Sequence, residues 1–98
     1  MQPQGHVQLL CNLVDFGFGV QTSLDAPRFR IELDDRVTVE STHQPDVFDA
    51  LAARGHSLTP GIPIPITFGG GQIIAVDQES GSLLGGSEPR KDGCAVGF

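Results

Sequence analysis

The stretch FRIELDDRVTVE, residues 29–40, decides the fold class of this 98-residue chain. Apolar residues occupy every second position before Asp34-Asp35 and again after it. Because the side chains of a strand point alternately to its two faces, this period of two predicts two strands with one buried face. Asp34-Asp35 is the expected turn between them, although this pair is a weaker hairpin signal than Asn-Gly or Asp-Gly.

A helix is expected before the strand pair. From His6 to Phe16 apolar residues recur at helical spacing on most sides, which predicts a helix buried on most sides. Pro3 precedes this run, and Gly17 and Gly19 supply the backbone freedom that a helix end requires. A helix this apolar needs covering elements, and few of the remaining residues could supply them.

Two further helices are predicted, one short and one amphipathic. Thr22 or Ser23 is expected to cap a helix of one or two turns, with Asp25 completing a capping box, and Pro27 ends it. The amphipathic helix begins with a proline in its first position and runs from Pro45 to Arg54-Gly55.

The second half of the chain adds two more strands. The alternating prolines of Pro60–Ile66 predict an extended connector or a sheet edge, because proline cannot donate to a sheet ladder. Gln72–Val76 is expected to be a strand buried on both faces, and Ser82–Gly86 its hairpin partner after a turn at Gln78–Gly81. The element order predicts an α+β fold, with antiparallel strands and two main helices.

Composition excludes several classes of function. Six basic and twelve acidic side chains give a net charge of −6, which repels phosphate backbones and anionic lipids, so no nucleic-acid partner is expected. The longest apolar stretches, Val7–Val14 and Ile62–Phe68, are far shorter than the roughly 20 residues of a membrane-spanning helix, so no membrane segment is expected. Met1-Gln2-Pro3 shows no secretory signal.

The residue types that usually carry chemistry lack the spacing that chemistry requires. The glycines 69–71 are followed by Gln72 and a predicted strand, so we interpret them as a close backbone turn and not as a phosphate loop. The three histidines lack metal-ligand spacing, so neither a metal nor a cofactor is predicted. Cys11 and Cys94 are interpreted as two separate buried thiols, and Asp34-Asp35 as a solvated turn.

One charged cluster, Glu88 to Asp92, follows the last predicted strand. Arg90 is suited to bidentate pairing with a carboxylate, and Glu88 or Asp92 could hold it. We interpret these residues as a structural clamp, with direct substrate contact as the alternative. Arg28 is likewise interpreted as a salt-bridged residue at the start of a strand. A ligand for a substrate carboxylate is the alternative.

Four segments carry a family resemblance. They are the front segment from Gln2-Pro3-Gln4-Gly5-His6 to Val14-Asp15-Phe16-Gly17, the central Asp25-Ala26-Pro27-Arg28-Phe29, the Gly86–Gly93 segment and the closing Gly93–Phe98. In this order they resemble the carboxy-terminal portion of a gamma-glutamyltransferase, also called gamma-glutamyltranspeptidase or glutathione hydrolase. The resemblance implies that residues 1–98 are a single partial domain, the last part of the small subunit, within an N-terminal-nucleophile hydrolase αββα sandwich.

The resemblance also implies an activity. A threonine hydroxyl, activated by its own α-amine, attacks a gamma-glutamyl amide such as that of glutathione, and the acyl group passes to water or to an amino acid. That threonine and the glycine amides of the oxyanion hole fall upstream of Met1, so no catalytic residue is assigned here and the chain alone is expected to be inactive. The implied partners are the rest of the small subunit, the large subunit and a gamma-glutamyl small molecule.

Alternatives to this function stay open. The Gln2–His6 segment resembles a transferase-like branch of bacterial members, which leaves a cephalosporin acylase possible beside hydrolase and transpeptidase. A function of another class is a non-catalytic scaffold that self-associates through the apolar helix at Val7–Val14. Bacterial members are often periplasmic or secreted, and the sequence itself predicts no location.

Overall fold

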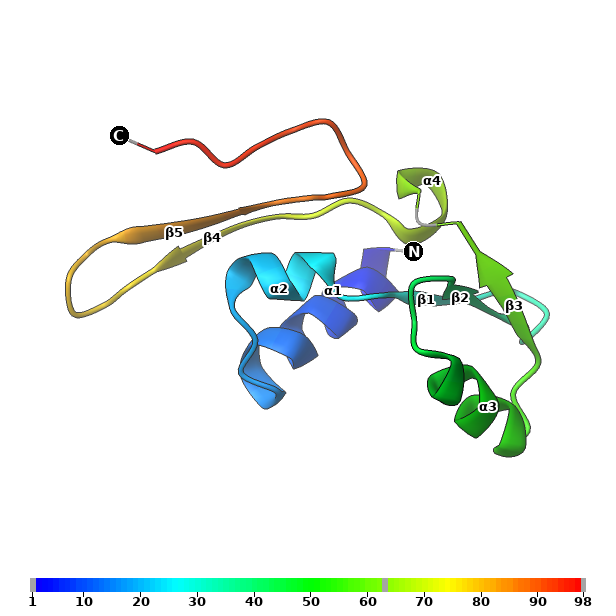
Figure 1. The fold of residues 1–98 in the computed structure, drawn as a ribbon. Coiled ribbons are helices and arrows are strands. Elements are labelled where there is room, and N and C mark those ends of the chain that lie inside the picture. The colour runs from blue at the N-terminus through cyan, green and yellow to red at the C-terminus, as the bar shows by residue number, and fades with distance from the viewer. Residues whose placement is uncertain (1, 63, 98) are drawn as a thin grey trace. The chain divides into compact units, whose positions relative to one another are not determined.

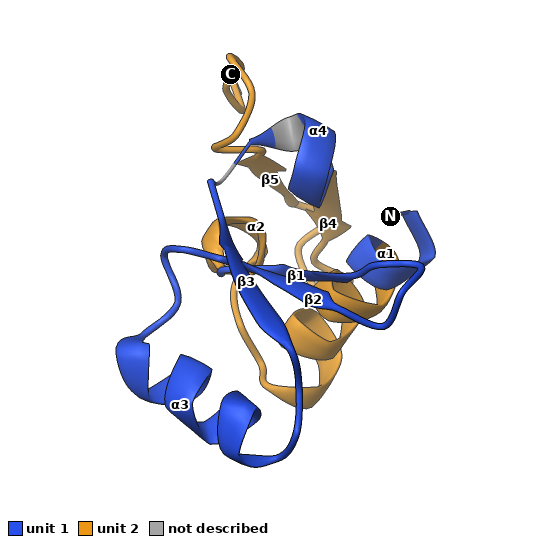
Figure 2. Cartoon of the chain, turned by 90° about the vertical axis from the view of Figure 1, so that its right-hand side faces the viewer, with its two compact units in different colours: residues 1–5, 27–69 blue, residues 6–26, 70–98 orange. Residues whose placement is uncertain are grey.

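The computed structural model describes residues 2–62 and 64–97, so Met1, Pro63 and Phe98 of the segments above lie outside the described residues. The chain divides into two compact units, Met1–Gly5 with Pro27–Gly69 (unit 1) and His6–Ala26 with Gly70–Phe98 (unit 2) (Figure 2). The elements follow in the order α1 (Gln2–Leu10), η1 (Cys11–Asp15), α2 (Val20–Asp25), β1 (Phe29–Ile31), β2 (Val37–Glu40), α3 (Pro45–Ala53), β3 (Leu58–Gly61), α4 (Pro65–Phe68), β4 (Gln72–Val76) and β5 (Leu83–Ser87) (Figure 1). The prediction of a single partial domain stays a prediction.

Unit 1 contains a three-stranded sheet in the order β1-β2-β3. The predicted hairpin is confirmed, because β1 and β2 pair antiparallel with Phe29 opposite Val39. The expectation of an antiparallel sheet is wrong for the third strand, since β3 pairs with β2 in parallel and places Leu58 opposite Val37. The reason is the crossover helix α3, which carries the chain back so that β3 starts beside the start of β2.

The proline-rich half of unit 1 fits the sequence expectation in part. Pro60 lies in β3, which is an edge strand, as a residue without a backbone donor requires. Helix α3 begins with Pro45 in its first turn and ends before Gly55, whose φ is +94°, so the predicted start and stop are confirmed. The short helix α4 was not predicted.

The core of unit 1 centres on Val39 and Phe68, which are almost fully buried. A Cβ atom at Gly61 would lie 2.8 Å from both Phe68 Cζ and Thr38 Cγ2, so the glycine allows this close packing. The predicted buried face of the hairpin is only partly present. It is covered at Val39 but open toward Leu33, which is fully exposed, because no described element of unit 1 packs over that end.

Unit 2 is built on the β4–β5 hairpin, in which Val76 pairs with Leu83 and Gln72 with Ser87. The hairpin is confirmed, but the prediction that β4 is buried on both faces is wrong. Ile74 and Val76 are exposed, although α2 packs on one face of the hairpin and Ala95 of the carboxy-terminal segment lies close to Gly85 on the other. An unbroken apolar run therefore did not distinguish a buried strand from one with exposed side chains.

Helix α2 packs Leu24 onto two glycines of the hairpin. The Leu24 side chain is fully buried, and Cβ atoms at Gly71 and Gly86 would lie 3.0 and 2.9 Å from its methyl groups. The predicted cap at Thr22 or Ser23 is wrong, because Gly19 is the N-cap residue and Ser23 instead donates to the Gly19 carbonyl oxygen at 2.8 Å. The predicted length of one or two turns is confirmed.

The first helix is longer than predicted and less buried. α1 begins at Gln2, continues into the π-helical turn η1, and ends before Gly17, whose φ is +67°. The expectation of a helix buried on most sides is wrong, because Val7 and Leu10 are exposed and Val14 is 76% exposed. The periodicity correctly located an apolar stripe that the described residues do not cover. None of the described helices is both long and apolar enough to span a membrane.

Candidate functional site

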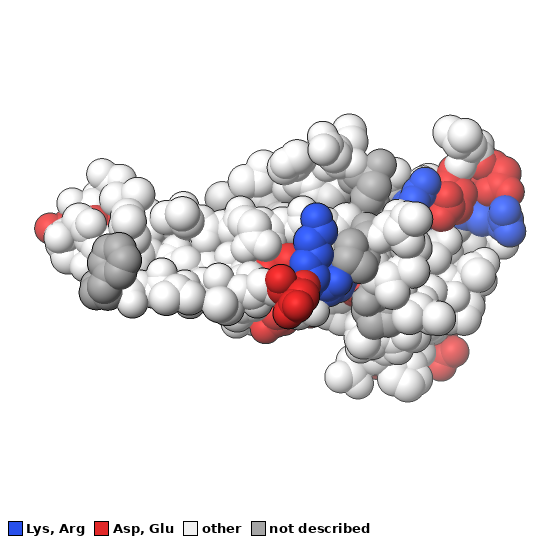
Figure 3. All heavy atoms as spheres, turned by 90° about the horizontal axis from the view of Figure 1, so that it is seen from above, with Lys and Arg blue, Asp and Glu red and all other residues white. Residues whose placement is uncertain are grey.

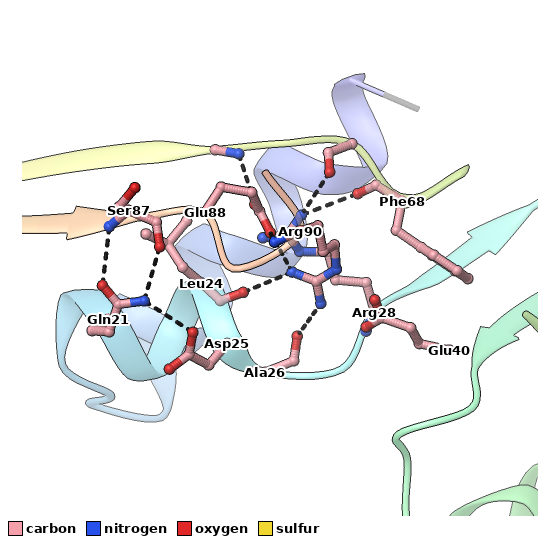
Figure 4. A network of polar contacts seen from close by, with 12 residues as sticks. Gln21, Leu24, Asp25, Ala26, Arg28, Glu40, Phe68, Ser87, Glu88 and Arg90 are labelled. Atoms are coloured by element: carbon pink, nitrogen blue, oxygen red, sulfur yellow. Dashed lines mark hydrogen bonds and ion pairs between the residues drawn. The ribbon is translucent and has the colours of Figure 1, made fainter. Parts of the chain in front are cut away.

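A buried ionic cluster in unit 2 joins the end of β5 to the end of α2 (Figure 4). Arg90 Nη1 lies 2.6 Å from Glu88 Oε1, and the two side chains are 4% and 0% exposed. The same guanidinium donates to the carbonyl oxygen of Leu24 at 2.9 Å and to that of Ala26 at 3.1 Å. Burying two charges is costly unless both are paired and their remaining donors and acceptors are satisfied, and this cluster meets that requirement.

The glycine loop before β4 belongs to this cluster. The Gly71 amide donates to Glu88 Oε2 at 2.8 Å, so the second carboxylate oxygen is also bonded. A Cβ atom at Gly70 would overlap the Lys91 side chain, and Gly69 has a φ of +76°. The glycines at 69–71 thus allow close packing and a positive φ angle. This agrees with the interpretation of the triplet as a close backbone turn.

Unit 1 has a corresponding buried arginine at the start of β1. Arg28 is 3% exposed, and its Nη1 donates to the carbonyl oxygens of Phe68 and Gly69 at 3.1 and 3.3 Å (Figure 4). Its backbone amide donates to Glu40 Oε2 at 2.8 Å, and Glu40 is fully buried. The guanidinium is thus bonded to backbone carbonyls at the segment that ends unit 1, where it is not accessible to a substrate carboxylate.

The four residues of the predicted clamp therefore separate. Glu88 and Arg90 lie together in unit 2, whereas Arg28 belongs to a different cluster in unit 1. Asp92 is exposed, and the described part of the chain gives its side chain no polar contact. That Glu88 and Arg90 act as a structural clamp stays a prediction.

Sequence reasoning passed over three polar residues that the structure places in contacts. Glu40 is the buried acceptor of the Arg28 amide, and the side chains of Gln4 and Gln21 each bond to a strand backbone. Gln4 lies in one of the segments that carry the family resemblance, and Glu40 occupies a polar position of the alternating pattern, so neither residue stood out. Only a residue-by-residue search for partners of strand-edge amides could have drawn attention to the glutamines.

The three histidines are dispersed, and among residues 2–62 and 64–97 no three His, Cys, Asp or Glu side chains gather closely enough to hold a metal. His6 and His56 are exposed. His43 packs edge-on against Phe48, and its Nε2 atom is buried without a hydrogen-bond partner in the described structure. Burial lowers the pKa of His43, although the Glu40 charge and a hydrogen bond to the Arg28 backbone act in the opposite direction.

The cysteines do not form a reactive pair. Both are free, and Cys94 is exposed and Cys11 half-buried, so the prediction of two buried thiols is wrong. Cys94 lies in the carboxy-terminal segment, in which residues 91–97 are exposed. Desolvation raises the pKa of Cys11, and the hydrogen bond and negative charge of Asp15 raise it further, so its thiolate is disfavoured.

A groove of about 840 Å³ lies in unit 2 between the hairpin and the carboxy-terminal segment. Its lining is apolar or uncharged, and contains no carboxylate, imidazole or amine that could serve as an acid or base. The lining residues are Gln72, Ile73, Ile74, Ser82, Leu83, Gly85, Gly86, Cys94, Ala95, Val96 and Gly97. This groove can accommodate an extended segment, and the Cys94 thiol is the one ionisable group among its described lining residues.

Charge is sparse on the surface that Figure 3 presents. Most of this face carries neither basic nor acidic side chains, and the blue groups that are visible have red groups beside them (Figure 3). A protein that binds a phosphate backbone needs a continuous basic patch. This face shows none.

Comparison with known proteins identifies the family that this chain resembles. Residues 1–98 match the family model described as gamma-glutamyltranspeptidase. The chain is 32% identical over 94 residues to the glutathione hydrolase proenzyme of Escherichia coli (strain K12), and the match covers 94% of the chain. It covers only 15% of that proenzyme, so the chain spans about one seventh of the curated relative.

Solved structures agree with this match. A cephalosporin acylase from Bacillus halodurans superposes with a TM-score of 0.91 at 43% identity, over 98% of this chain and 18% of the acylase chain. A gamma-glutamyltranspeptidase from Pseudomonas nitroreducens complexed with L-DON superposes with a TM-score of 0.78 at 24% identity, over 96% of this chain and 48% of that one. At 24% identity the transpeptidase comparison shows the fold alone, and the two folds agree.

Proposed function

The chain belongs to the gamma-glutamyltranspeptidase family, and from this premise we propose that it is the carboxy-terminal part of the small subunit of an enzyme that cleaves gamma-glutamyl amides. The observation that carries the proposal is the family match over all 98 residues, together with 32% identity to a glutathione hydrolase proenzyme. The α+β fragment would form one part of an N-terminal-nucleophile hydrolase αββα sandwich. The remaining polypeptide of that small subunit and the large subunit are its proposed partners.

The proposed reaction proceeds through an acyl-enzyme. A threonine hydroxyl outside these 98 residues loses its proton to the α-amine of the same residue and attacks the amide carbon, while backbone amides stabilise the oxyanion. The amine leaves with a proton, and water or an amino acid then takes the gamma-glutamyl group. An α-amine suits this role because it titrates near neutral pH. The reaction needs no cofactor.

The proposed contribution of this chain is structural support. Its buried polar clusters at Arg90 and Arg28 bond to backbone carbonyls and carboxylates within the chain. The described lining of its groove contains no carboxylate, imidazole or amine, and Cys11 is disfavoured as a thiolate. These features favour a role in holding the hairpin and the loops, with the reacting groups supplied elsewhere in the enzyme.

A second candidate reaction is deacylation of a cephalosporin, in which the amide bond to a glutaryl side chain is hydrolysed. The observation that favours it is the 43% identity to a cephalosporin acylase, which exceeds the 32% identity to the glutathione hydrolase proenzyme. Glutaryl and gamma-glutamyl groups differ by one α-amine, so both candidates require the same acyl transfer and differ in whether the pocket binds that amine. Residues that bind the amine are not assigned to this chain.

The two candidates are separated by substrate preference. An intact polypeptide that contains this segment is assayed with gamma-glutamyl-p-nitroanilide and with glutaryl-p-nitroanilide, which share a leaving group and differ in the α-amine. A higher kcat/KM for the gamma-glutamyl compound supports the glutathione hydrolase assignment. A higher value for the glutaryl compound supports the acylase, and hydrolysis of neither substrate contradicts both proposals.

A further inference from the structure

Two glutamine side chains bind strand edges in the same way. Ile31 donates its backbone N–H to Gln4 Oε1 at 2.7 Å and accepts from Gln4 Nε2 at 3.1 Å. Ser87 donates to Gln21 Oε1 at 3.0 Å and accepts from Gln21 Nε2 at 2.9 Å (Figure 4). In both places the primary amide forms the pair of bonds that a residue of a neighbouring strand would form.

The two strand residues face the free edges of their sheets. Arg28 and Glu32, which flank β1, form backbone hydrogen bonds with Glu40 and Arg36. Because the bonding direction alternates along a strand, the backbone N–H and C=O of Ile31 point away from β2. In the hairpin of unit 2, Ser82 accepts from the opposite strand, so the odd-numbered residues up to Ser87 point outward. β1 and β5 are both edge strands, and such edges are templates for pairing with another chain.

We propose that Gln4 and Gln21 are edge caps, each of which occupies one free position of an edge strand and prevents that position from pairing with another strand. Both come from helices, α1 and α2, so each cap is held in a fixed place instead of depending on a loop. The bonds of Gln4 join two residues of unit 1, and the bonds of Gln21 join α2 to β5 within unit 2. Neither role depends on which amide the enzyme cleaves.

Methionine is the substitution that tests this role. Gln4→Met and Gln21→Met keep the length and helix propensity of the side chain but remove both hydrogen bonds to the strand. Gln21→Met also removes the bond that Gln21 Nε2 donates to Asp25 Oδ1 at 2.9 Å within α2. Gln44→Met and Gln78→Met are the matched controls, because these exposed glutamines have no side-chain bond in the described structure. Amide hydrogen exchange of Ile31 and Ser87 is followed by NMR, and the mass of the protein in solution by light scattering.

We expect the Ile31 amide in Gln4→Met, and the Ser87 amide in Gln21→Met, to exchange about tenfold faster than in the unchanged protein, the size of one lost hydrogen bond. We also expect both variants, and neither control, to form more high-mass species. Unchanged exchange would overturn the proposed bonds. Faster exchange with unchanged association would overturn the protective role while leaving the bonds in place.

A measurement on the unchanged protein keeps the proposal testable if a variant fails to fold. A through-hydrogen-bond scalar coupling is expected between the Ile31 amide nitrogen and the Gln4 side-chain carbonyl carbon, and likewise between Ser87 and Gln21. Both amides should also be protected from exchange, although they face away from their partner strands. Free exchange of these two amides in the folded protein would overturn the proposal without any substitution.

Discussion

Two ion pairs with the same sequence spacing occupy opposite environments. Asp34–Arg36 in unit 1 has its atoms 2.7 Å apart at a turn, with side chains 54% and 60% exposed, whereas Glu88–Arg90 in unit 2 is 2.6 Å apart and almost fully buried. In the first, water solvates both partners. In the second, backbone groups replace water around both charges, so each partner depends on the other.

Sequence spacing identifies an ion pair, but burial determines how much the folded state depends on it. Exposed pairs contribute little because water screens them and ordering two side chains costs entropy. A buried pair contributes little net stability compared with apolar residues, yet removing one partner leaves a charge that nothing solvates. The two regions should therefore respond very differently to the same substitution.

The largest effect is expected from Arg90→Met. This change leaves the Glu88 carboxylate buried without its cation and removes the bonds to the Leu24 and Ala26 carbonyls, at a cost of about 3–5 kcal/mol in unfolding free energy. Urea unfolding followed by circular dichroism measures it. The double variant Glu88→Gln with Arg90→Met should recover part of the loss, and a loss no greater than that of Arg36→Met would show that the cluster is not a clamp.

A smaller effect is expected where unit 1 is closed by apolar packing. Gly61→Ala places a methyl group 2.8 Å from Phe68 Cζ and Thr38 Cγ2, so the core must shift, at a cost of about 1–3 kcal/mol. Urea midpoints compared with Gly97→Ala, where no described atom lies within 4 Å, isolate the clash. An equal midpoint for both variants would mean that Phe68 does not pack as described.

A pH-dependent effect is expected from His43. Because burial lowers its pKa below the ordinary value of 6.5, the unfolded chain takes up the proton first as the pH falls. The stability that neutral His43 contributes is full above about pH 6.5 and is lost as the pH falls from there toward its lowered pKa. His43→Gln should flatten the slope of unfolding free energy in this window, while His56→Gln keeps it. A slope unchanged by His43→Gln would contradict the burial of this imidazole.

The smallest effect is expected at the exposed pair. Arg36→Met removes the contact to Asp34, but both side chains are already solvated, so the urea midpoint should not change measurably. The contact with Arg36 lowers the pKa of Asp34, chiefly through a side-chain hydrogen bond, so any contribution is lost as the pH falls below 3.8 toward the lowered value. A large loss of stability at neutral pH would erase the contrast with Arg90.

Local sequence signals predicted the elements of this fold better than their environments. The alternation around Asp34-Asp35 located the β1–β2 hairpin, and Pro45 and Gly55 located the ends of α3, because turn and cap chemistry acts within a few residues. The parallel β3 escaped prediction because strand direction depends on where the crossover places the chain. The predicted burial of β4 and α1 was wrong, because an apolar pattern in the sequence identifies an apolar face but not the element that covers it.

The candidate site shows the same limit. The segment containing Glu88 and Arg90 was singled out from its charges, and the structure brings these two together. Arg28 and Asp92 do not join them, since charge and spacing do not state which carbonyls a guanidinium will reach. The hydrogen bonds of the Gln4 and Gln21 side-chain amides to the Ile31 and Ser87 backbones could not be predicted. They join residues that are 27 and 66 positions apart in the sequence.

The claim that the reactive threonine lies outside these 98 residues has one direct test. The purified chain is incubated with gamma-glutamyl-p-nitroanilide, and release of p-nitroaniline is followed by absorbance beside a protein-free blank. We expect a rate equal to that of the blank at every protein concentration. A rate that rises in proportion to the concentration of pure chain would contradict it and would place the nucleophile within this sequence.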